Sequence, residues 1–195
     1  GTGNIGVIGN ADLEPEKTVS YEIGIQYKID SFSALDMTMY FRDIRDLTGT
    51  RSDVIFTYNG ATYNRYENSD FAFVKGLVLS YKKQFLNGFS TTFDYTFQQA
   101  KGTASNPFDA YNSSLSNEFP EIQIIPLNWD QRHTINATLY YDSKNWGLGL
   151  IGKIGSGQPY TPFISDNFST LITNSKTKPM TSNIDLRTYM SFPKL

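Results

Sequence analysis

Residues 17–29 read KTVSYEIGIQYKI, and every second position from Val19 to Ile29 is apolar. The positions between them are polar or glycine: Ser20, Glu22, Gly24, Gln26 and Lys28. Successive side chains of a β-strand point to opposite faces, so this segment predicts a strand with one apolar and one polar face. In a soluble sheet the apolar face would cover a core. In a membrane barrel it would face lipid, and the polar face would line the lumen.

The same alternation recurs along the chain and predicts seven antiparallel strands. They cover residues 17–29, 34–42, 71–82, 89–99, 131–141, 146–154 and 183–190. Three tight connections of about four or five residues, rich in turn-forming residues, cover 30–33, 84–88 and 142–145. Three long connections of more than twenty residues each cover 43–70, 101–128 and 155–181. Short and long connections therefore alternate.

The composition excludes several classes of protein. The chain has 195 residues, of which 15% are aromatic, and it lacks the run of about 20 apolar residues that a transmembrane helix needs. Its formal charge of −2 argues against a nucleic-acid-binding protein, which would carry a basic patch. The absence of cysteine removes disulfides, zinc–thiolate sites and thiol nucleophiles. A membrane barrel stays open, because its strands need only about 9–11 residues, half of them polar.

The connections help to separate the two environments. Loops longer than about 12–15 residues without structure of their own are uncommon in compact soluble domains, whereas outer-membrane barrels have short periplasmic turns and long extracellular loops. Aromatic residues near the tight turns fit a girdle at the membrane–water boundary: Tyr27, Phe32, Tyr81, Phe85, Phe89, Tyr141, Trp146, Tyr189 and Phe192. The pattern favours an all-β fold of antiparallel up-and-down strands forming part of a transmembrane β-barrel. A soluble all-β ligand-binding module, for example for carbohydrate, is the alternative.

A series of short motifs adds a family resemblance. The chain contains NADLEPEKT at residues 10–18, followed by SYEIG at 20–24. Further motifs follow in order: YFRDIRDL at 40–47, VKG at 74–76, NWDQRH at 128–133, GSGQPYTP at 155–162 and NIDLR at 183–187. Together they resemble the later part of the barrel of TonB-dependent outer-membrane receptors. The LEPEKT form is more similar to the branch nearer siderophore and cobalamin receptors than to the starch-uptake branch.

The resemblance implies a location in the bacterial outer membrane and a role in importing a scarce ligand, such as a siderophore, cobalamin or an oligosaccharide. Barrels of this transporter class have about 22 strands, so seven strands cannot close one. Residues 1–195 are therefore expected to form a single partial barrel segment, without plug domain, TonB box or final barrel strands. The implied partners are outer-membrane lipid, the plug and remaining strands of the parent chain, and TonB through the missing N-terminal part. No catalytic, cofactor or metal role is expected, and the protein is predicted not to be an enzyme.

Ligand contacts are expected in the long loops, because the extracellular loops of barrels carry recognition. The candidate contact residues are loop aromatics that could stack on a substrate: Tyr58, Tyr63, Tyr66, Phe108, Tyr111, Phe119, Tyr160 and Phe163. For each of them, packing of the loops against one another is the competing interpretation. Polar residues expected to face the lumen, and so to contact a plug or water, are Glu22, Gln26, Lys28, Asp36, Arg42, Asp94, Gln98 and Arg132.

Three smaller motifs have structural interpretations. Residues 1–6 match G-x-G-x-x-G but lack the preceding strand and following helix of a nucleotide site, so a flexible loop is predicted. His133 is the only histidine, and its strand phase places it on the apolar face, which favours an interface role over catalysis. Asp43 and Asp46, with Arg42 and Arg45, predict local ion pairs where the second strand ends, each worth about 0–1 kcal/mol when exposed.

Overall fold

The computed structural model describes residues 4–51, 56–104, 106–108, 110–111, 123–162 and 173–192. The strands assigned in these ranges are β1 (Asn4–Ile8), β2 (Lys17–Asp30), β3 (Ser33–Gly49), β4 (Phe56–Tyr58), β5 (Ala61–Arg65), β6 (Glu67–Gln84), β7 (Phe89–Gly102), β8 (Ile125–Pro126), β9 (His133–Asp142), β10 (Trp146–Gly155), β11 (Pro159–Tyr160), β12 (Lys176–Thr177) and β13 (Thr181–Met190). No helix within the described ranges is long and apolar enough to span a membrane.

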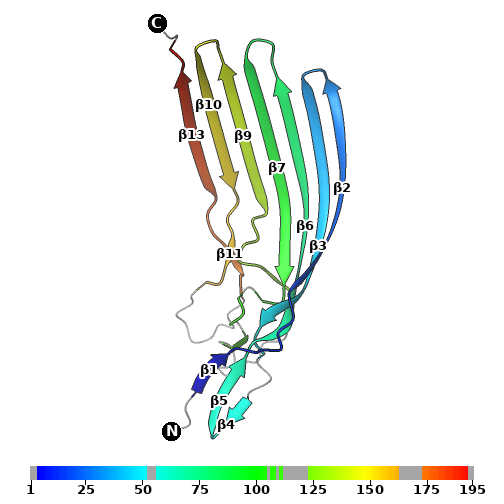
Figure 1. Cartoon of the computed structure of the whole chain (residues 1–195), viewed down its shortest axis with the longest axis vertical. Helices are drawn as coiled ribbons and strands as arrows, with labels where there is room; N and C mark the ends of the chain where they lie inside the picture. The colour runs from blue at the N-terminus through cyan, green and yellow to red at the C-terminus, as the bar shows by residue number, and fades with distance from the viewer. Residues whose placement is uncertain are drawn as a thin grey trace.

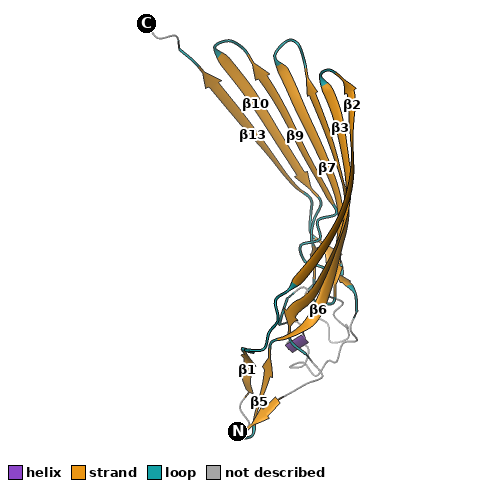
Figure 2. Ribbon diagram, turned by 45° about the vertical axis from the view of Figure 1, so that its right-hand side comes forward, coloured by secondary structure: helices purple, strands orange, loops and turns teal. Residues whose placement is uncertain are grey.

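Seven long strands form one antiparallel sheet in the order β13-β10-β9-β7-β6-β3-β2, with β8 added to the end of β7. Each long strand pairs with the long strand that follows it in the sequence, so the sheet is an up-and-down meander. The three tight turns gather at one end and β1, β4 and β5 lie at the other (Figure 1). Figure 2 shows that the sheet is strongly curved. The predicted fold class and all seven predicted strands are confirmed.

The long connections are more structured than the sequence pattern predicted. The connection predicted over 43–70 is wrong at both ends, since β3 continues to Gly49 and β6 begins at Glu67. Between them β4 and β5 form a hairpin around Asn59 and Gly60, which have φ values of 49° and 77°. Positive φ at both central residues is the type I′ geometry that Asn-Gly favours.

The N-terminal residues belong to this outer structure as well. Strand β1 pairs in parallel with β5, giving a three-stranded sheet in the order β1-β5-β4, named here the outer sheet. The predicted flexible loop over residues 1–6 is therefore wrong for the described residues 4–6, which lie in β1. Residues 1–3 lie outside the described residues.

The register of the long strands produces one largely apolar face, which Lys75 of β6 interrupts. A single row crosses five strands and consists of Ile25, Met37, Leu79, Tyr95 and Ile135. Many side chains on this face are solvent-exposed, for example Ile23 at 67% and Ile184 at 74%. A soluble sheet would cover such a surface, because burying apolar area is the main favourable term in folding. Among the described residues, no other element covers this apolar face.

The opposite face is polar over its central part, in all seven long strands. Its central row crosses all seven long strands and consists of Gln26, Asp36, Ser80, Asp94, Asn136, Lys153 and Asn183. Within the row, the Ser80 hydroxyl donates a hydrogen bond to Asp94. Successive residues therefore alternate between apolar and polar surfaces across the whole sheet, as in the wall of a membrane barrel.

The predicted aromatic girdle is partly wrong. Tyr141 on the apolar face contacts Phe89 and Trp146, with ring centroids 4.6 and 4.9 Å apart, as a girdle requires. Tyr189, in contrast, pairs with Gly147 on the polar face, and its hydroxyl donates to Asp142 at 2.7 Å. Proximity to a turn did not determine its direction, because strand phase places Tyr189 opposite to the apolar side chains of β13.

A small core lies on the polar face, where the sheet approaches the outer sheet. It consists of the buried side chains Ala72, Val74, Ala100 and Leu127. Leu127 follows β8, so the segment after β8 covers the ends of β6 and β7 here. The core positions the loops over one end of the polar face.

Candidate functional site

A buried carboxylate fixes the segment of residues 127–132, which crosses the outer end of the polar face and is called here the crossing segment. Asp130 is 0% exposed, and its Oδ1 accepts the backbone N–H of Ala100 at 2.8 Å. Arg132 Nε donates to its Oδ2 at 2.7 Å. The Ala100 carbonyl in turn accepts the N–H of Leu127 at 3.1 Å.

The position of this carboxylate in the β-ladder explains its role. β7 pairs with β9 as far as Phe97 and with β8 from Lys101, so Ala100 lies between the two partner strands. Its N–H would lack a strand partner, and a buried N–H without a partner costs about 1–3 kcal/mol. Asp130 supplies the missing acceptor. The sequence marked this residue only as part of the 128–133 motif, without indicating its contact.

A second fixed point lies at the outer end of β2. The Lys17 ammonium lies 2.9 Å from both a Glu14 and an Asp46 carboxylate oxygen. Hydrogen bonds to Glu14 first and then to Asp46 raise the pKa of Lys17 above its ordinary value. Because the pKa is raised in the folded state, any stabilisation from this cluster is present at neutral pH and is lost only as the pH rises into the alkaline range. Asp46, at φ 59°, lies where the β3–β6 register shifts.

The ion pairs predicted where the second strand ends are partly confirmed. Arg45 pairs with Asp43 at 2.7 Å on the exposed surface. Asp46 instead pairs with Lys17, and the nearest carboxylate to Arg42 is Glu22, at 3.8 Å. The charges therefore join β2 to β3 as well as acting within β3.

A cavity of about 250 Å³ lies beside the small core, between the ends of β3 and β6 and the crossing loops. Its apolar lining includes Leu47, Leu127 and Trp129. Its two carboxylates already accept hydrogen bonds, Glu16 from the Thr48 N–H at 3.2 Å and Asp70 from Thr103 Oγ1 at 2.8 Å. The cavity was not predicted from the sequence, because its lining comes from five separate segments.

The structure separates the predicted ligand-contacting aromatics into packed and exposed members. Tyr63 stacks on Phe56 in the outer sheet, with centroids 5.3 Å apart. Tyr66 meets Phe108 edge to face at 5.7 Å. Tyr58, beside the β4–β5 turn, is 68% exposed. Direct ring contacts therefore support the packing interpretation for Tyr63, Tyr66 and Phe108.

The remaining candidates lie in other loops. Tyr160 belongs to β11 and pairs with Lys176 of β12, at 37% exposure. The backbone N–H of Tyr111 donates to Thr50 Oγ1 at 3.1 Å. Phe119 and Phe163 lie outside the described residues. The structure does not gather the described candidates into one aromatic site, and their role in ligand contact stays a prediction.

His133 lies on the apolar face, as its strand phase predicted. Its Nδ1 lies 2.8 Å from the Tyr95 hydroxyl, and its ring stacks on that of Tyr95 and contacts that of Phe97. These contacts are aromatic packing and one hydrogen bond. Among the described residues, no group of three or more histidine, cysteine, aspartate or glutamate side chains could hold a metal ion.

Comparison with known proteins identifies the family. A family profile described as "TonB dependent receptor-like, beta-barrel" matches residues 1–192. The chain belongs to the TonB-dependent receptor family. A search of curated proteins found no match to this receptor segment.

Solved structures show the same fold. The outer membrane transporter YddB from Escherichia coli superposes with a TM-score of 0.74 at 11% identity, covering 96% of the receptor segment and 28% of YddB. The FrpB iron transporter from Neisseria meningitidis (F3-3 variant) gives 0.61 at 14% identity, with coverages of 95% and 26%. The copper transporter OprC gives 0.55 at 16% identity, with coverages of 92% and 24%. The receptor segment therefore spans about a quarter of the length of these transporters, and its long sheet is a portion of an outer-membrane β-barrel fold.

Proposed function

We propose that this receptor segment forms part of the wall of an energised importer in the bacterial outer membrane. The observation that carries the proposal is the exposed apolar face backed by a continuous polar face. Ten residue steps separate Phe71 from Tyr81 on the apolar face of β6. At about 3.3 Å per residue and a tilt of about 40°, they span about 25 Å of bilayer, the height of the apolar band of such barrels.

The orientation follows from the connections. The tight turns would face the periplasm, and the outer sheet with its loops would face the cell exterior. The polar row around Asp36 and Asp94 would then line the lumen, where the plug of the parent chain would sit. The two outermost strands, β2 and β13, each pair on one side only within the described residues, which leaves both edges for further strands of the parent chain. Closing the barrel would pair these two edges with the remaining strands.

We infer an iron-chelate or cobalamin ligand as the class of cargo. The 10–18 motif resembles the branch of the family nearer to siderophore and cobalamin receptors. FrpB is an iron transporter and OprC a copper transporter, which agrees with a metal-containing cargo. Coupling through TonB would use the proton-motive force, and the residues that perform it lie in other parts of such receptors.

The soluble ligand-binding module is the weaker candidate. Such a module would place the apolar sides of β2 and β13 against a core. Ile25 is instead 61% exposed and Leu186 is 66% exposed. No covering layer for this face occurs among the described residues.

Site-directed spin labelling of the full-length protein in lipid vesicles tests the wall assignment. Leu79→Cys and Ser80→Cys place nitroxides on adjacent residues of β6 that face opposite sides. The label at position 79 should collide mainly with oxygen, which dissolves in lipid, and the label at position 80 with a water-soluble nickel complex. Equal accessibility of both labels to the nickel complex would contradict a membrane-facing surface.

Uptake assays test the cargo. Cells that lack the chromosomal gene and carry it on a plasmid should accumulate either a radiolabelled ferric siderophore or labelled cobalamin. Accumulation should stop when an uncoupler removes the proton-motive force. Uptake that persists with the uncoupler, or that is absent for both probes, would overturn the cargo assignment while leaving the spin-label result intact.

A further inference from the structure

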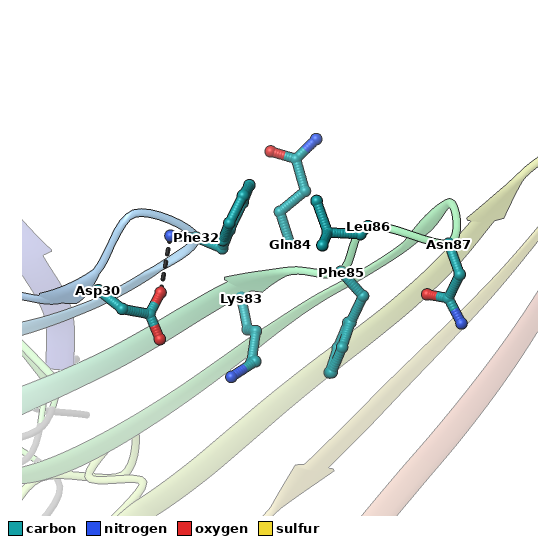
Figure 3. Close-up of a pocket in the computed structure, with 7 residues that line it drawn as sticks. All are labelled: Asp30, Phe32, Lys83, Gln84, Phe85, Leu86 and Asn87. Atoms are coloured by element: carbon teal, nitrogen blue, oxygen red, sulfur yellow. Dashed lines mark hydrogen bonds between the residues drawn. The ribbon is translucent and has the colours of Figure 1, made fainter.

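Two adjacent tight turns form a cleft (Figure 3), and these turns lie at the end of the sheet opposite to the outer sheet (Figure 1). The β2–β3 turn contributes Phe32, and the β6–β7 turn contributes Phe85 and Leu86. A backbone hydrogen bond from the Gln84 N–H to the Phe32 carbonyl, at 2.8 Å, joins the two turns. The cleft has a volume of about 300 Å³ and walls that this cross-turn bond fixes in place.

The turn tips are unusually apolar. Phe32 is 46% exposed, Phe85 is 41% exposed and Leu86 is 86% exposed. Tight turns in water are dominated by Gly, Pro, Asn, Asp and Ser, each for a conformational reason that these three residues do not share. Three large apolar side chains on neighbouring turns therefore indicate an environment that is partly apolar.

The cleft also contains one charge of each sign. The Lys83 ammonium lies 5.5 Å from the centre of the Phe85 ring, and Asp30 Oδ1 accepts the Phe32 N–H at 2.7 Å. Figure 3 shows Lys83 and Phe85 extending in the same direction, with Asp30 beside Lys83, whereas Phe32 and Leu86 extend to the other side. Lys83 and Asp30 form no ion pair with each other within 4 Å, and within the described part of the chain neither has another such partner. A cation and an anion thus border one apolar cleft without neutralising each other directly.

The position of the cleft relative to the bilayer follows from the positions of its residues along β6. Lys83 lies two residues beyond Tyr81, on the same face of β6. Two steps correspond to about 7 Å along the strand and about 5 Å across a bilayer at the usual barrel tilt. Tyr81 would stand at the edge of the hydrocarbon layer, so Lys83 would reach the headgroup layer, where lysine side chains commonly place their charge.

We propose that this cleft binds the headgroup of a zwitterionic phospholipid that carries a phosphate and a primary ammonium. Lys83 donates a hydrogen bond to a phosphate oxygen, and Asp30 accepts one from the ammonium. Phe85, which extends to the same side as Lys83, contacts the glycerol and the first acyl methylenes (Figure 3). The proposal rests on the membrane placement given under Proposed function. Two complementary charges select this headgroup, because phosphatidylglycerol offers Asp30 only neutral hydroxyl donors and a quaternary ammonium has no N–H to donate.

Native mass spectrometry of the full-length protein tests the site. The protein is transferred from detergent containing equal amounts of phosphatidylethanolamine, phosphatidylglycerol and phosphatidylcholine. The wild-type protein should retain phosphatidylethanolamine preferentially. Lys83→Gln should weaken that retention about ten- to hundredfold, the effect of removing a charge-assisted hydrogen bond. Lys82→Gln is the matched control, since Lys82 is the adjacent residue on the polar face of the same strand and should leave retention unchanged.

Asp30→Asn separates the two halves of the site. It should abolish the preference for phosphatidylethanolamine over phosphatidylcholine while leaving binding of the phosphate. Equal retention of the three lipids by the wild-type protein, or equal losses in Lys82→Gln and Lys83→Gln, would overturn the proposal. Competition by water-soluble glycerophosphoethanolamine at the affinity of the whole lipid would also overturn it, because the apolar contacts would then contribute nothing. Each of these three contradicting results could occur while the spin label at position 79 still faces lipid. Failure of the headgroup proposal can therefore be distinguished from failure of the proposed membrane wall.

Discussion

Replacing Asp130 with alanine removes the acceptor that lies between two partner strands of β7. Ala100 and Asp130 are both 0% exposed, so the Ala100 N–H would lose its partner without gaining water. An orphaned buried N–H costs about 1–3 kcal/mol. The lost pair with Arg132, whose side chain is 40% exposed, adds about 0–1 kcal/mol. The expected loss of stability is about 1–4 kcal/mol in the full-length protein.

Two measurements check this value. Denaturant unfolding of the protein in lipid vesicles gives the free energy of unfolding. Hydrogen–deuterium exchange of a peptide containing Ala100 gives the local protection, which should fall about tenfold or more if about 1.4 kcal/mol or more of local stability is lost. Asp130→Asn should cost less, because an amide oxygen still accepts the Ala100 N–H.

The control is Asp12→Ala, which removes an exposed carboxylate and should change stability by no more than about 0.5 kcal/mol. The reasoning would be refuted if Asp130→Ala matched this control in stability and left exchange near Ala100 unchanged. That result would mean that the crossing segment is held by its backbone hydrogen bonds, such as those from Leu127 to Ala100 and from Gln98 to Arg132.

Two further comparisons use matched pairs. A Cβ on Gly149 would lie 2.6 Å from Cε1 of the Tyr140 ring, whereas a Cβ on Gly152 of the same strand would meet nothing nearer than 3.9 Å. Gly149→Ala should therefore destabilise the protein by about 1–3 kcal/mol, and Gly152→Ala should be neutral or slightly stabilising. Thermal unfolding measures both effects, and equal melting temperatures of the two variants would contradict the expected overlap. Tyr58→Ala removes an exposed ring and should weaken ligand binding without changing the melting temperature. Tyr66→Ala removes a packed ring and should lower the melting temperature. An unchanged ligand affinity in Tyr58→Ala would remove Tyr58 from the candidate contacts.

The strands were predictable because their signal is local. The alternation from Val19 to Ile29 predicts which side chains share a face, and turn residues such as Asn87 and Gly88 predict where the chain reverses. The same local rule would have corrected Tyr189, whose phase is opposite to that of Ile184 and Leu186. The girdle prediction used proximity to a turn instead.

The candidate site was less predictable because its contacts are non-local. The parallel pairing of β1 with β5 joins residues more than fifty positions apart, and no periodicity records such a partner. Asn59-Gly60 is a dipeptide that favours a hairpin turn, but the hairpin that it forms lies inside a segment that was predicted to be a loop. The loop aromatics were identifiable by type, yet only the fold distinguishes the packed Tyr66 from the exposed Tyr58.

The sequence by itself therefore determined the two faces of the sheet, since alternation of side chains is fixed by strand geometry one residue at a time. The tertiary structure decided the apposition of segments across the long connections. It placed Asp130 against the Ala100 N–H, and it brought Asp30 and Lys83 from the ends of β2 and β6 to one cleft. Such contacts depend on register and curvature accumulated over several strands, and a register difference of one residue would turn each of these side chains to the other face.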